Sequence, residues 1–130
     1  MAMDRIKILI IDDDVNIRKT LKKLLLVSGY DVCEAQNGKV GLDLFRENNV
    51  DLVITDMLMP EKSGAEVIME LKTEYPDVKI IAMSGYGDEL PDEFMDLPEG
   101  LNADSILPKP FRLHELQSTI KNTLLTYEEV

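Results

Sequence analysis

Short apolar runs alternate with segments of helical period along most of this chain. The first run, residues 6–11, is almost entirely aliphatic, which is typical of a strand buried on both faces. It stops at three consecutive aspartates, residues 12–14. After them, apolar side chains recur at intervals of three and four residues, which predicts one buried face of a helix. These side chains are Ile17, Leu21, Leu24 and Leu25.

The same alternation continues to the end of the chain. Further strands are predicted over residues 30–35, 50–55, 78–83 and 105–107. Helical stripes follow at Val40, Leu44 and Phe45, at Val67, Ile68 and Leu71, and at Leu113, Leu116, Ile120 and Leu124. Residues 88–102 carry two prolines, which predicts a short or broken helix between the fourth and fifth strands.

Polar residues mark where several of these helices begin and end. Asp14 is predicted to cap the first helix, and Gly29 to end it. Ser63 and Glu66 fit a capping box at the start of the third helix.

Five strands alternating with helices predict an α/β fold, with a doubly wound parallel sheet and helices on both faces. In such sheets, ligands bind beyond the carboxyl ends of the strands, near the point where the strand order reverses. Polar residues at strand ends are therefore the first candidates for chemistry.

Length, charge and cysteine content narrow the class of protein. The 130 residues suit one domain, 1–130, with a core of about 5–126. Asp and Glu number 25 against 14 Lys and Arg, and a net charge of −11 disfavours direct binding of nucleic acid or of an anionic membrane. No apolar run is long enough to span a bilayer, and we expect a cytoplasmic protein. The single cysteine, Cys33, excludes an internal disulfide framework, and we expect it to be a small core residue.

Polar residues follow four of the predicted strands. They are Asp12, Asp13 and Asp14 after the first strand, Asp56 after the third, Ser84 after the fourth and Lys109 after the fifth. Carboxylates crowded on one rim repel one another unless a cation neutralises them. A set of oxygen ligands without His or Cys favours Mg²⁺. Together with a lysine and a hydroxyl that can bind phosphate oxygens, this rim predicts a phosphoryl-transfer centre in which an aspartate can be the nucleophile.

Four motifs in this order resemble the receiver domain of two-component response regulators, of the chemotaxis-regulator type. They are residues 8–14 (ILIIDDD), 53–60 (VITDMLMP), 83–85 (MSG) and 107–111 (LPKPF). The resemblance covers almost the whole chain and implies a flavodoxin-like strand order of 2-1-3-4-5.

The resemblance also implies a role for each acid. Asp56 would take a phosphoryl group from a sensor histidine kinase or a histidine phosphotransfer protein. Asp13 and Asp56 would bind Mg²⁺ directly, together with the backbone carbonyl of Leu58, while Asp12 would act mainly through a metal-bound water. The domain would catalyse its own phosphorylation and slow dephosphorylation.

The remaining motif residues would bind the phosphoryl group. Ser84 and Gly85 would lie beside it, and Lys109 would form an ion pair with it. The Lys109–Pro110 peptide bond would be cis. Phosphorylation would then switch the surface that binds an output protein or a second copy of the chain, and the sequence identifies neither partner.

The chain departs from the family pattern at several positions. Ile106 stands where relatives commonly carry a switch aromatic, so we predict a weaker or differently built switch that is read through the loop after Ser84. Asn102 replaces a glycine before the fifth strand, and the preceding segment is longer than usual. Leu58 and Tyr86 flank the expected phosphoryl site, and we predict that they slow the loss of the phosphoryl group to water.

Two other functions stay open at this point. A phosphohydrolase with an aspartate nucleophile would use similar residues, but it needs an acid two positions after the nucleophile, where this chain has Leu58. An interaction module with an unused pocket is the second alternative. Among the remaining polar residues, Asp14 is interpreted as a helix cap and His114 as a surface residue.

Overall fold

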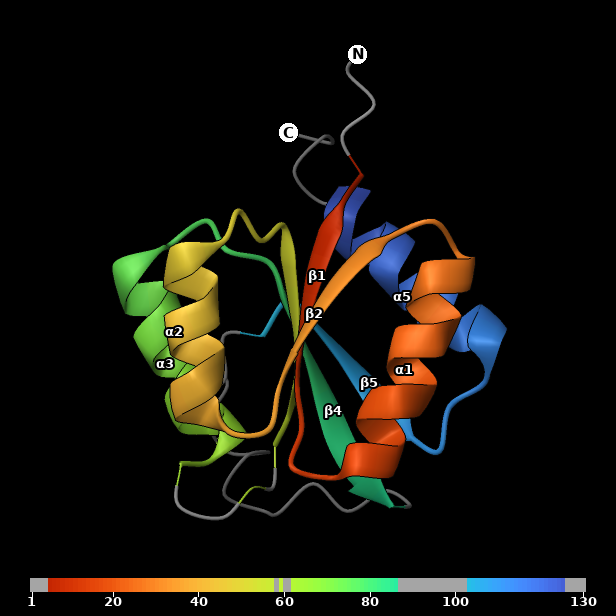
Figure 1. The fold of residues 1–130 in the computed structure, drawn as a ribbon, viewed down its shortest axis with the longest axis horizontal. Coiled ribbons are helices and arrows are strands. Elements are labelled where there is room, and N and C mark those ends of the chain that lie inside the picture. Colours follow the sequence, from red (N-terminus) through yellow and green to blue (C-terminus); the bar gives the residue numbers. More distant parts are fainter. Residues whose placement is uncertain (1–4, 58, 60–61, 87–102, 126–130) are drawn as a thin grey trace.

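A computed structural model describes residues 5–57, 59, 62–86 and 103–125, and they form one parallel sheet flanked by helices (Figure 1). The strands are β1 (Lys7–Ile11), β2 (Asp31–Ala35), β3 (Leu52–Asp56), β4 (Ile80–Tyr86) and β5 (Ser105–Lys109). The described helices are α1 (Val15–Val27), α2 (Gly38–Glu47), α3 (Gly64–Glu74) and α5 (Leu113–Leu125). The strand order is β2-β1-β3-β4-β5, which confirms the predicted doubly wound fold.

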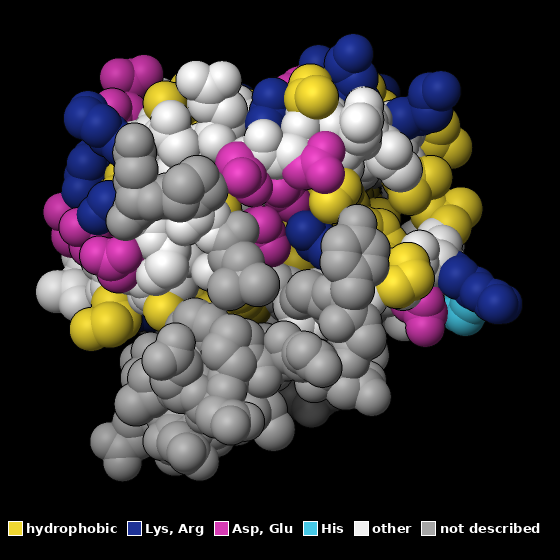
Figure 2. Space-filling model, turned by 90° about the horizontal axis from the view of Figure 1, so that it is seen from below, with side chains coloured by type: hydrophobic (Ala, Val, Ile, Leu, Met, Phe, Trp, Pro, Cys, Tyr) yellow, Lys and Arg dark blue, Asp and Glu magenta, His cyan; other side chains and the backbone are white. Residues whose placement is uncertain are grey.

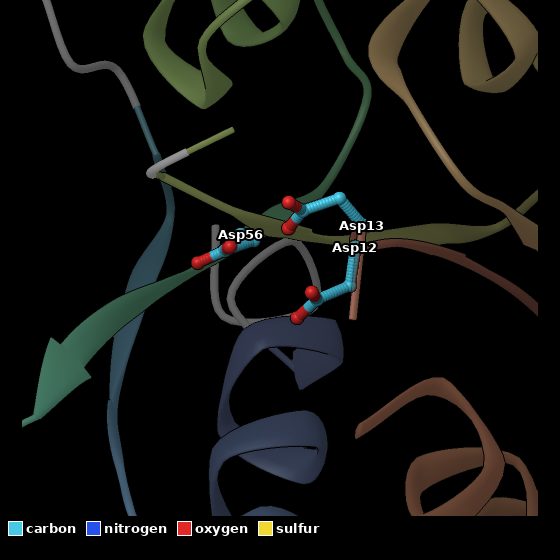
Figure 3. Close-up of side chains that lie close together, drawn as sticks. All are labelled: Asp12, Asp13 and Asp56. Atoms are coloured by element: carbon cyan, nitrogen blue, oxygen red, sulfur yellow. The ribbon is translucent and has the colours of Figure 1, made fainter. Parts of the chain in front are cut away.

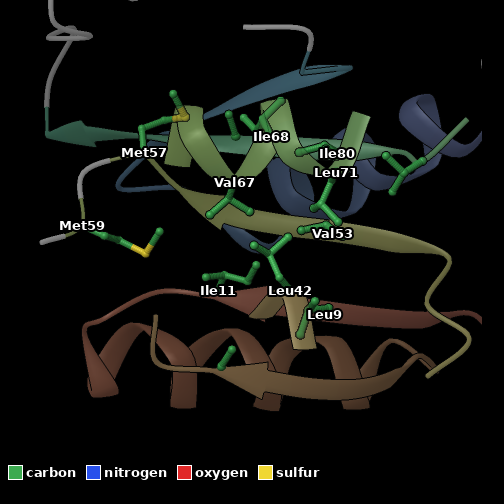
Figure 4. Close-up of a cluster of buried hydrophobic side chains, with 13 residues drawn as sticks. Leu9, Ile11, Leu42, Val53, Met57, Met59, Val67, Ile68, Leu71 and Ile80 are labelled. Carbon is green, nitrogen blue, oxygen red and sulfur yellow. The ribbon is translucent and has the colours of Figure 1, made fainter. Parts of the chain in front are cut away.

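The sheet is covered on both faces, by α2 and α3 on one side and by α1 and α5 on the other (Figure 1). Side chains of β1 alternate between the two layers: Leu9 and Ile11 pack toward α2 and α3, while Ile8 and Ile10 pack toward α1 and α5. All four are fully buried. Figure 4 shows the first layer, in which Val53 from β3, Val67 from α3 and Met57, directly after β3, lie among the side chains packed against β1. Two apolar layers explain why this strand has no polar face.

The predicted helix boundaries are confirmed. The Asp14 side chain accepts hydrogen bonds from the backbone N–H groups of Asn16 and Ile17 and so caps α1. Gly29, just beyond that helix, has a φ of +97°, which favours glycine. Ser63 and Glu66 form the capping box of α3. In the described part of the chain, no helix is both long and apolar enough to cross a membrane.

The ends of β4 and β5 differ from the prediction. β4 starts at Ile80, two residues later than expected, and runs to Tyr86, while β5 continues to Lys109 rather than ending at Leu107. Ser84 pairs with Pro108 and Tyr86 with Lys109, so the register shifts at Gly85 as in a β-bulge. The hydrophobic pattern missed these residues because Ser, Gly, Pro and Lys are poor strand formers, and pairing between the two strands holds them extended. The helix predicted within residues 88–102 lies outside the described residues.

Candidate functional site

The carboxyl ends of the strands bring together the acids that the sequence places far apart. β1 and β3 are neighbours at the point where the strand order reverses, so Asp12, directly after β1, lies beside Asp56, the last residue of β3. One carboxylate oxygen from each of Asp12, Asp13 and Asp56 lies within 4.8 Å of the others, and the three groups face a common space (Figure 3). Figure 2 shows acidic side chains gathered near the middle of this end of the molecule.

The burial of these acids is unequal. Asp12 and Asp56 are buried, with exposed fractions of 0% and 5%, whereas Asp13 is exposed. Three carboxylates with no sulfur or imidazole ligand among them match the preference of Mg²⁺ for oxygen ligands. The residues present therefore fit a magnesium ion, with Asp13 at the side that opens to solvent.

Lys109 places a positive charge beside the two buried acids. Its Nζ donates hydrogen bonds to Oδ2 of Asp12 at 3.1 Å and to Oδ1 of Asp56 at 3.3 Å. Burial of the ammonium lowers the pKa of Lys109, but the attraction of Asp56 and Asp12 outweighs it and leaves this pKa above its usual value. Lys109 is therefore a fixed cation, held at the end of β5 beside both buried acids.

The fold alters the protonation of Asp12. Burial raises the pKa of its carboxyl group above the usual value, although a hydrogen bond from the Asp14 amide and the charge of Lys109 oppose the rise. The Asp14 N–H donates to Oδ1 of Asp12 at 2.8 Å, so this carboxylate is held in one orientation. A divalent cation would relieve the cost of keeping it charged.

The other predicted site residues are placed as follows. Ser84 is buried in β4, one residue beyond Met83, which pairs with Asp56, and the backbone of Gly85 continues the same strand. Ile106 is 42% exposed on β5, on the face opposite the buried Leu107. The Lys109–Pro110 peptide bond is cis. Leu58 lies outside the described residues, and its predicted carbonyl ligand stays a prediction.

Sequence reasoning missed two residues that support the acids. A Cβ on Gly64 would lie 2.2 Å from the carbonyl oxygen of Asp56, so α3 begins in direct contact with the end of β3. Nη1 of Arg18 donates to the carbonyl oxygen of Asp12 at 2.6 Å. The sequence signals were weak, because a glycine at a helix start and an arginine beside an apolar stripe are both common for other reasons.

A doubly wound parallel sheet with three carboxylates and a lysine at the carboxyl ends of its strands places this chain among α/β domains whose acidic cluster could hold a cation. Comparison with known families narrows this class, because the model for the response regulator receiver domain matches residues 8–121. The chain belongs to the response regulator receiver domain family.

Relatives with established names agree with this assignment. Response regulator MprA of Mycobacterium sp. (strain KMS) is 36% identical over 119 residues, which cover 92% of this chain and 50% of that protein. The chain thus spans about half the length of the curated relatives it matches.

Solved structures share both sequence and fold. A response regulator receiver domain protein from Clostridium thermocellum is 36% identical, with a TM-score of 0.83 and coverage of 95% of this chain and 98% of that one. Response regulator protein TrrA from Thermotoga maritima, solved in complex with Mg²⁺ and BeF, is 37% identical, with a TM-score of 0.80 and coverage of 92% and 99%.

Proposed function

We propose that Asp56 is the phosphoacceptor of this receiver domain and that it accepts its phosphoryl group in a Mg²⁺-dependent reaction. The observation that carries the proposal is the position of the Asp56 carboxylate, which is hydrogen-bonded to Lys109 and close to both Asp12 and Asp13. A nucleophilic carboxylate needs a group that offsets the charge of the incoming phosphoryl group, and Lys109 is placed to do so.

In the proposed reaction, a carboxylate oxygen of Asp56 attacks the phosphorus of a phosphohistidine. The new bond is a P–O bond to Asp56, the P–N bond to the donor breaks, and the imidazole leaves with a proton from solvent. Asp13, Asp56 and the Leu58 carbonyl would hold Mg²⁺ directly, and Asp12 would act through a bound water. When bound, Mg²⁺ would offset the negative charge of the acids and the donor.

Lys109 and Ser84 would stabilise the product. The Lys109 ammonium already contacts the Asp56 carboxylate, and a short movement would bring it to a phosphoryl oxygen. Ser84, buried in the neighbouring strand, would donate its hydroxyl to another phosphoryl oxygen, next to the backbone of Gly85. Movement of Ser84 toward the phosphoryl group would link the modification to the surface near Ile106, as a population shift between two arrangements.

The donor we propose is a sensor histidine kinase or a histidine phosphotransfer protein in the cytoplasm. The output protein is unidentified, and homodimerisation through the switched surface is a second way in which the domain could signal. Curated relatives described as response regulators support this role, although the chain covers about half of their length. The slow loss of the phosphoryl group expected from Leu58 and Tyr86 stays a prediction.

The test is phosphorylation by acetyl phosphate, measured as intact mass with and without Mg²⁺. We expect the gain of one phosphoryl group that requires Mg²⁺ and is absent in Asp56→Asn. Rapid turnover of acetyl phosphate without an adduct would favour a phosphohydrolase instead. No adduct, together with no binding of beryllofluoride, would indicate an interaction module with an unused pocket.

A further inference from the structure

Arg18, near the start of α1, contacts the chain segment that carries two of the three acids. Its Nη1 donates to the carbonyl oxygen of Asp12 at 2.6 Å, and its Nε donates to Oε1 of Glu34 on β2 at 3.2 Å. Only 13% of the Arg18 side chain is exposed. The second carboxylate oxygen of Glu34 pairs with Nζ of Lys22 at 3.3 Å. One guanidinium group therefore joins α1, β2 and the end of β1.

The carbonyl that Arg18 contacts belongs to the peptide unit between Asp12 and Asp13. Because a peptide unit is planar, a hydrogen bond that orients this carbonyl also orients the N–H and Cα of Asp13. On the other side of Asp12, its own N–H donates to the carbonyl oxygen of Ala35 at 3.2 Å. The backbone at Asp12 is thus fixed from β2 on one side and from Arg18 on the other.

We propose that Arg18, held in place by Glu34, is a positioning residue that fixes the Asp12–Asp13 peptide for cation binding. This inference rests on the proposed function, because it assumes that these acids bind Mg²⁺. Groups behind the ligands of a metal site commonly orient those ligands and so raise affinity. Arginine suits the task because its planar fork can bond a carboxylate and a carbonyl at the same time, which the single ammonium of lysine does less well.

The charge of Arg18 and its positioning role predict opposite effects on Mg²⁺ affinity when Arg18 is removed. A positive charge near three carboxylates repels a second cation, so its loss alone would tighten Mg²⁺ binding. Loss of positioning would weaken it. Lys22→Met is the matched control, because Lys22 lies on the same helix and pairs with the same glutamate but makes no hydrogen bond to Asp12 in the described part of the chain.

The experiment is a Mg²⁺ titration of the full chain, followed by amide shifts in NMR spectra or by calorimetry. We expect Arg18→Met to bind Mg²⁺ about tenfold more weakly than the unmodified chain, Arg18→Lys to lie between the two, and Lys22→Met to bind equally or more tightly. The Mg²⁺ concentration that half-saturates phosphorylation by acetyl phosphate should rise in Arg18→Met by the same factor. The rate at saturating Mg²⁺ should recover, because Arg18 orients the cation site without touching the phosphoryl group.

Three results would overturn the proposal. The first is Mg²⁺ affinity in Arg18→Met equal to or higher than in the unmodified chain. The second is a reduced rate at saturating Mg²⁺ with an unchanged half-saturating concentration. The third result applies if thermal melting shows that Arg18→Met does not fold. In that case, unchanged Mg²⁺ affinity in Arg18→Lys would overturn the proposal. An unmodified chain that binds no Mg²⁺ would overturn the proposed function as well, so the two failures are distinguishable.

Discussion

Among single residues, Asp12 combines full burial with a carboxylate that, in the described part of the chain, accepts hydrogen bonds from Lys109 and from one backbone amide. Its raised pKa means that the folded protein holds this proton more tightly than the unfolded chain does. The contribution of Asp12 to the unfolding free energy is therefore complete below the unfolded pKa and is lost as the pH rises through the folded pKa. At pH values above the folded pKa, without Mg²⁺, the charged carboxylate destabilises the fold.

Asp12→Asn should therefore raise the melting temperature at pH 7 in buffer that contains a chelator. The asparagine keeps an oxygen that can accept from the Asp14 amide but carries no charge. The gain should shrink as the pH falls through the folded-state pKa, because the unmodified carboxyl group then becomes neutral too. Glu47→Gln, which removes the same charge from an exposed position on α2, is the control for the loss of one negative charge. A gain that is absent at pH 7, or constant with pH, would contradict this explanation.

Gly64 is the second residue on which the position of the nucleophile depends. The Cβ of Gly64→Ala would lie 2.2 Å from the Asp56 carbonyl oxygen and 2.7 Å from Cα of Met57, so the backbone at the end of β3 must shift. We expect a loss of about 1–3 kcal/mol in unfolding free energy. Phosphorylation should slow by roughly ten- to a hundredfold, because the reacting carboxylate is displaced.

Gly29→Ala provides the comparison for this variant. Gly29 has a φ of +97°, so alanine is strained there and costs about 1–2 kcal/mol, but a Cβ would lie more than 4 Å from every described residue other than its two chain neighbours. Stability should fall in both variants when measured by urea unfolding, while phosphorylation slows only in Gly64→Ala. Equal rates in the two variants would show that contact with Gly64 does not position Asp56.

The sequence predicted that the acids and Lys109 belong to the site because the end of a strand is a local feature. It is visible as an apolar run that is followed closely by a charged residue. It did not predict Arg18 or Gly64 as supports of the site. Their roles depend on which atoms α1 and α3 bring against the ends of β1 and β3, and those contacts are tertiary.

Between elements, Asp104 ties the start of β4 to the residues that lead into β5. Its Oδ2 accepts from the N–H of Ile80 at 2.8 Å and from Nζ of Lys72 at 3.1 Å, while its own N–H donates to the Ile80 carbonyl at 2.8 Å. Lys72 also donates to the carbonyl oxygen of Val78. This one carboxylate thereby links α3, the start of β4 and the residue before β5. It lies where these strands begin, at the opposite end of the sheet from the acidic site.

Asp104→Ala should lower the unfolding free energy by about 1–3 kcal/mol, because the buried N–H of Ile80 loses its acceptor. Lys39→Ala, which in the described part of the chain breaks an exposed ion pair with Asp43 on α2, should change the unfolding free energy by no more than about 0.5 kcal/mol. Urea unfolding of both variants measures the difference. Similar losses would mean that the Asp104 contacts add nothing beyond a surface ion pair.

The prediction of helices and strands succeeded where residue type and spacing mark an element's start. It failed at the strand ends that are extended only because two strands pair with each other. The caps at Asp14 and Ser63 follow from residue type and spacing alone, and both are present. The last residues of β4 and β5 are extended because each strand pairs with the other across a register shift at Gly85, a relation that no local pattern contains.

For the whole molecule, binding of a cation at the acidic rim should be coupled to global stability. A ligand that binds only the folded state stabilises it by about 2.7 kcal/mol at a hundredfold excess over its Kd. Mg²⁺ should therefore raise the melting temperature, and beryllofluoride with Mg²⁺ should raise it further. In Asp13→Asn both increases should be much smaller, because one carboxylate of the cluster is lost. An equal increase in this variant would place the stabilising cation elsewhere.

The most direct test of the central claim identifies the residue that carries the phosphoryl group. Borohydride reduces an aspartyl phosphate to homoserine with release of phosphate, which leaves a permanent mark at the modified position. After treatment of the chain with acetyl phosphate and Mg²⁺, peptide mass spectrometry should find homoserine at position 56 and nowhere else. Homoserine at Asp12 or Asp13, or none in a chain that has gained phosphoryl mass, would contradict the assignment of Asp56.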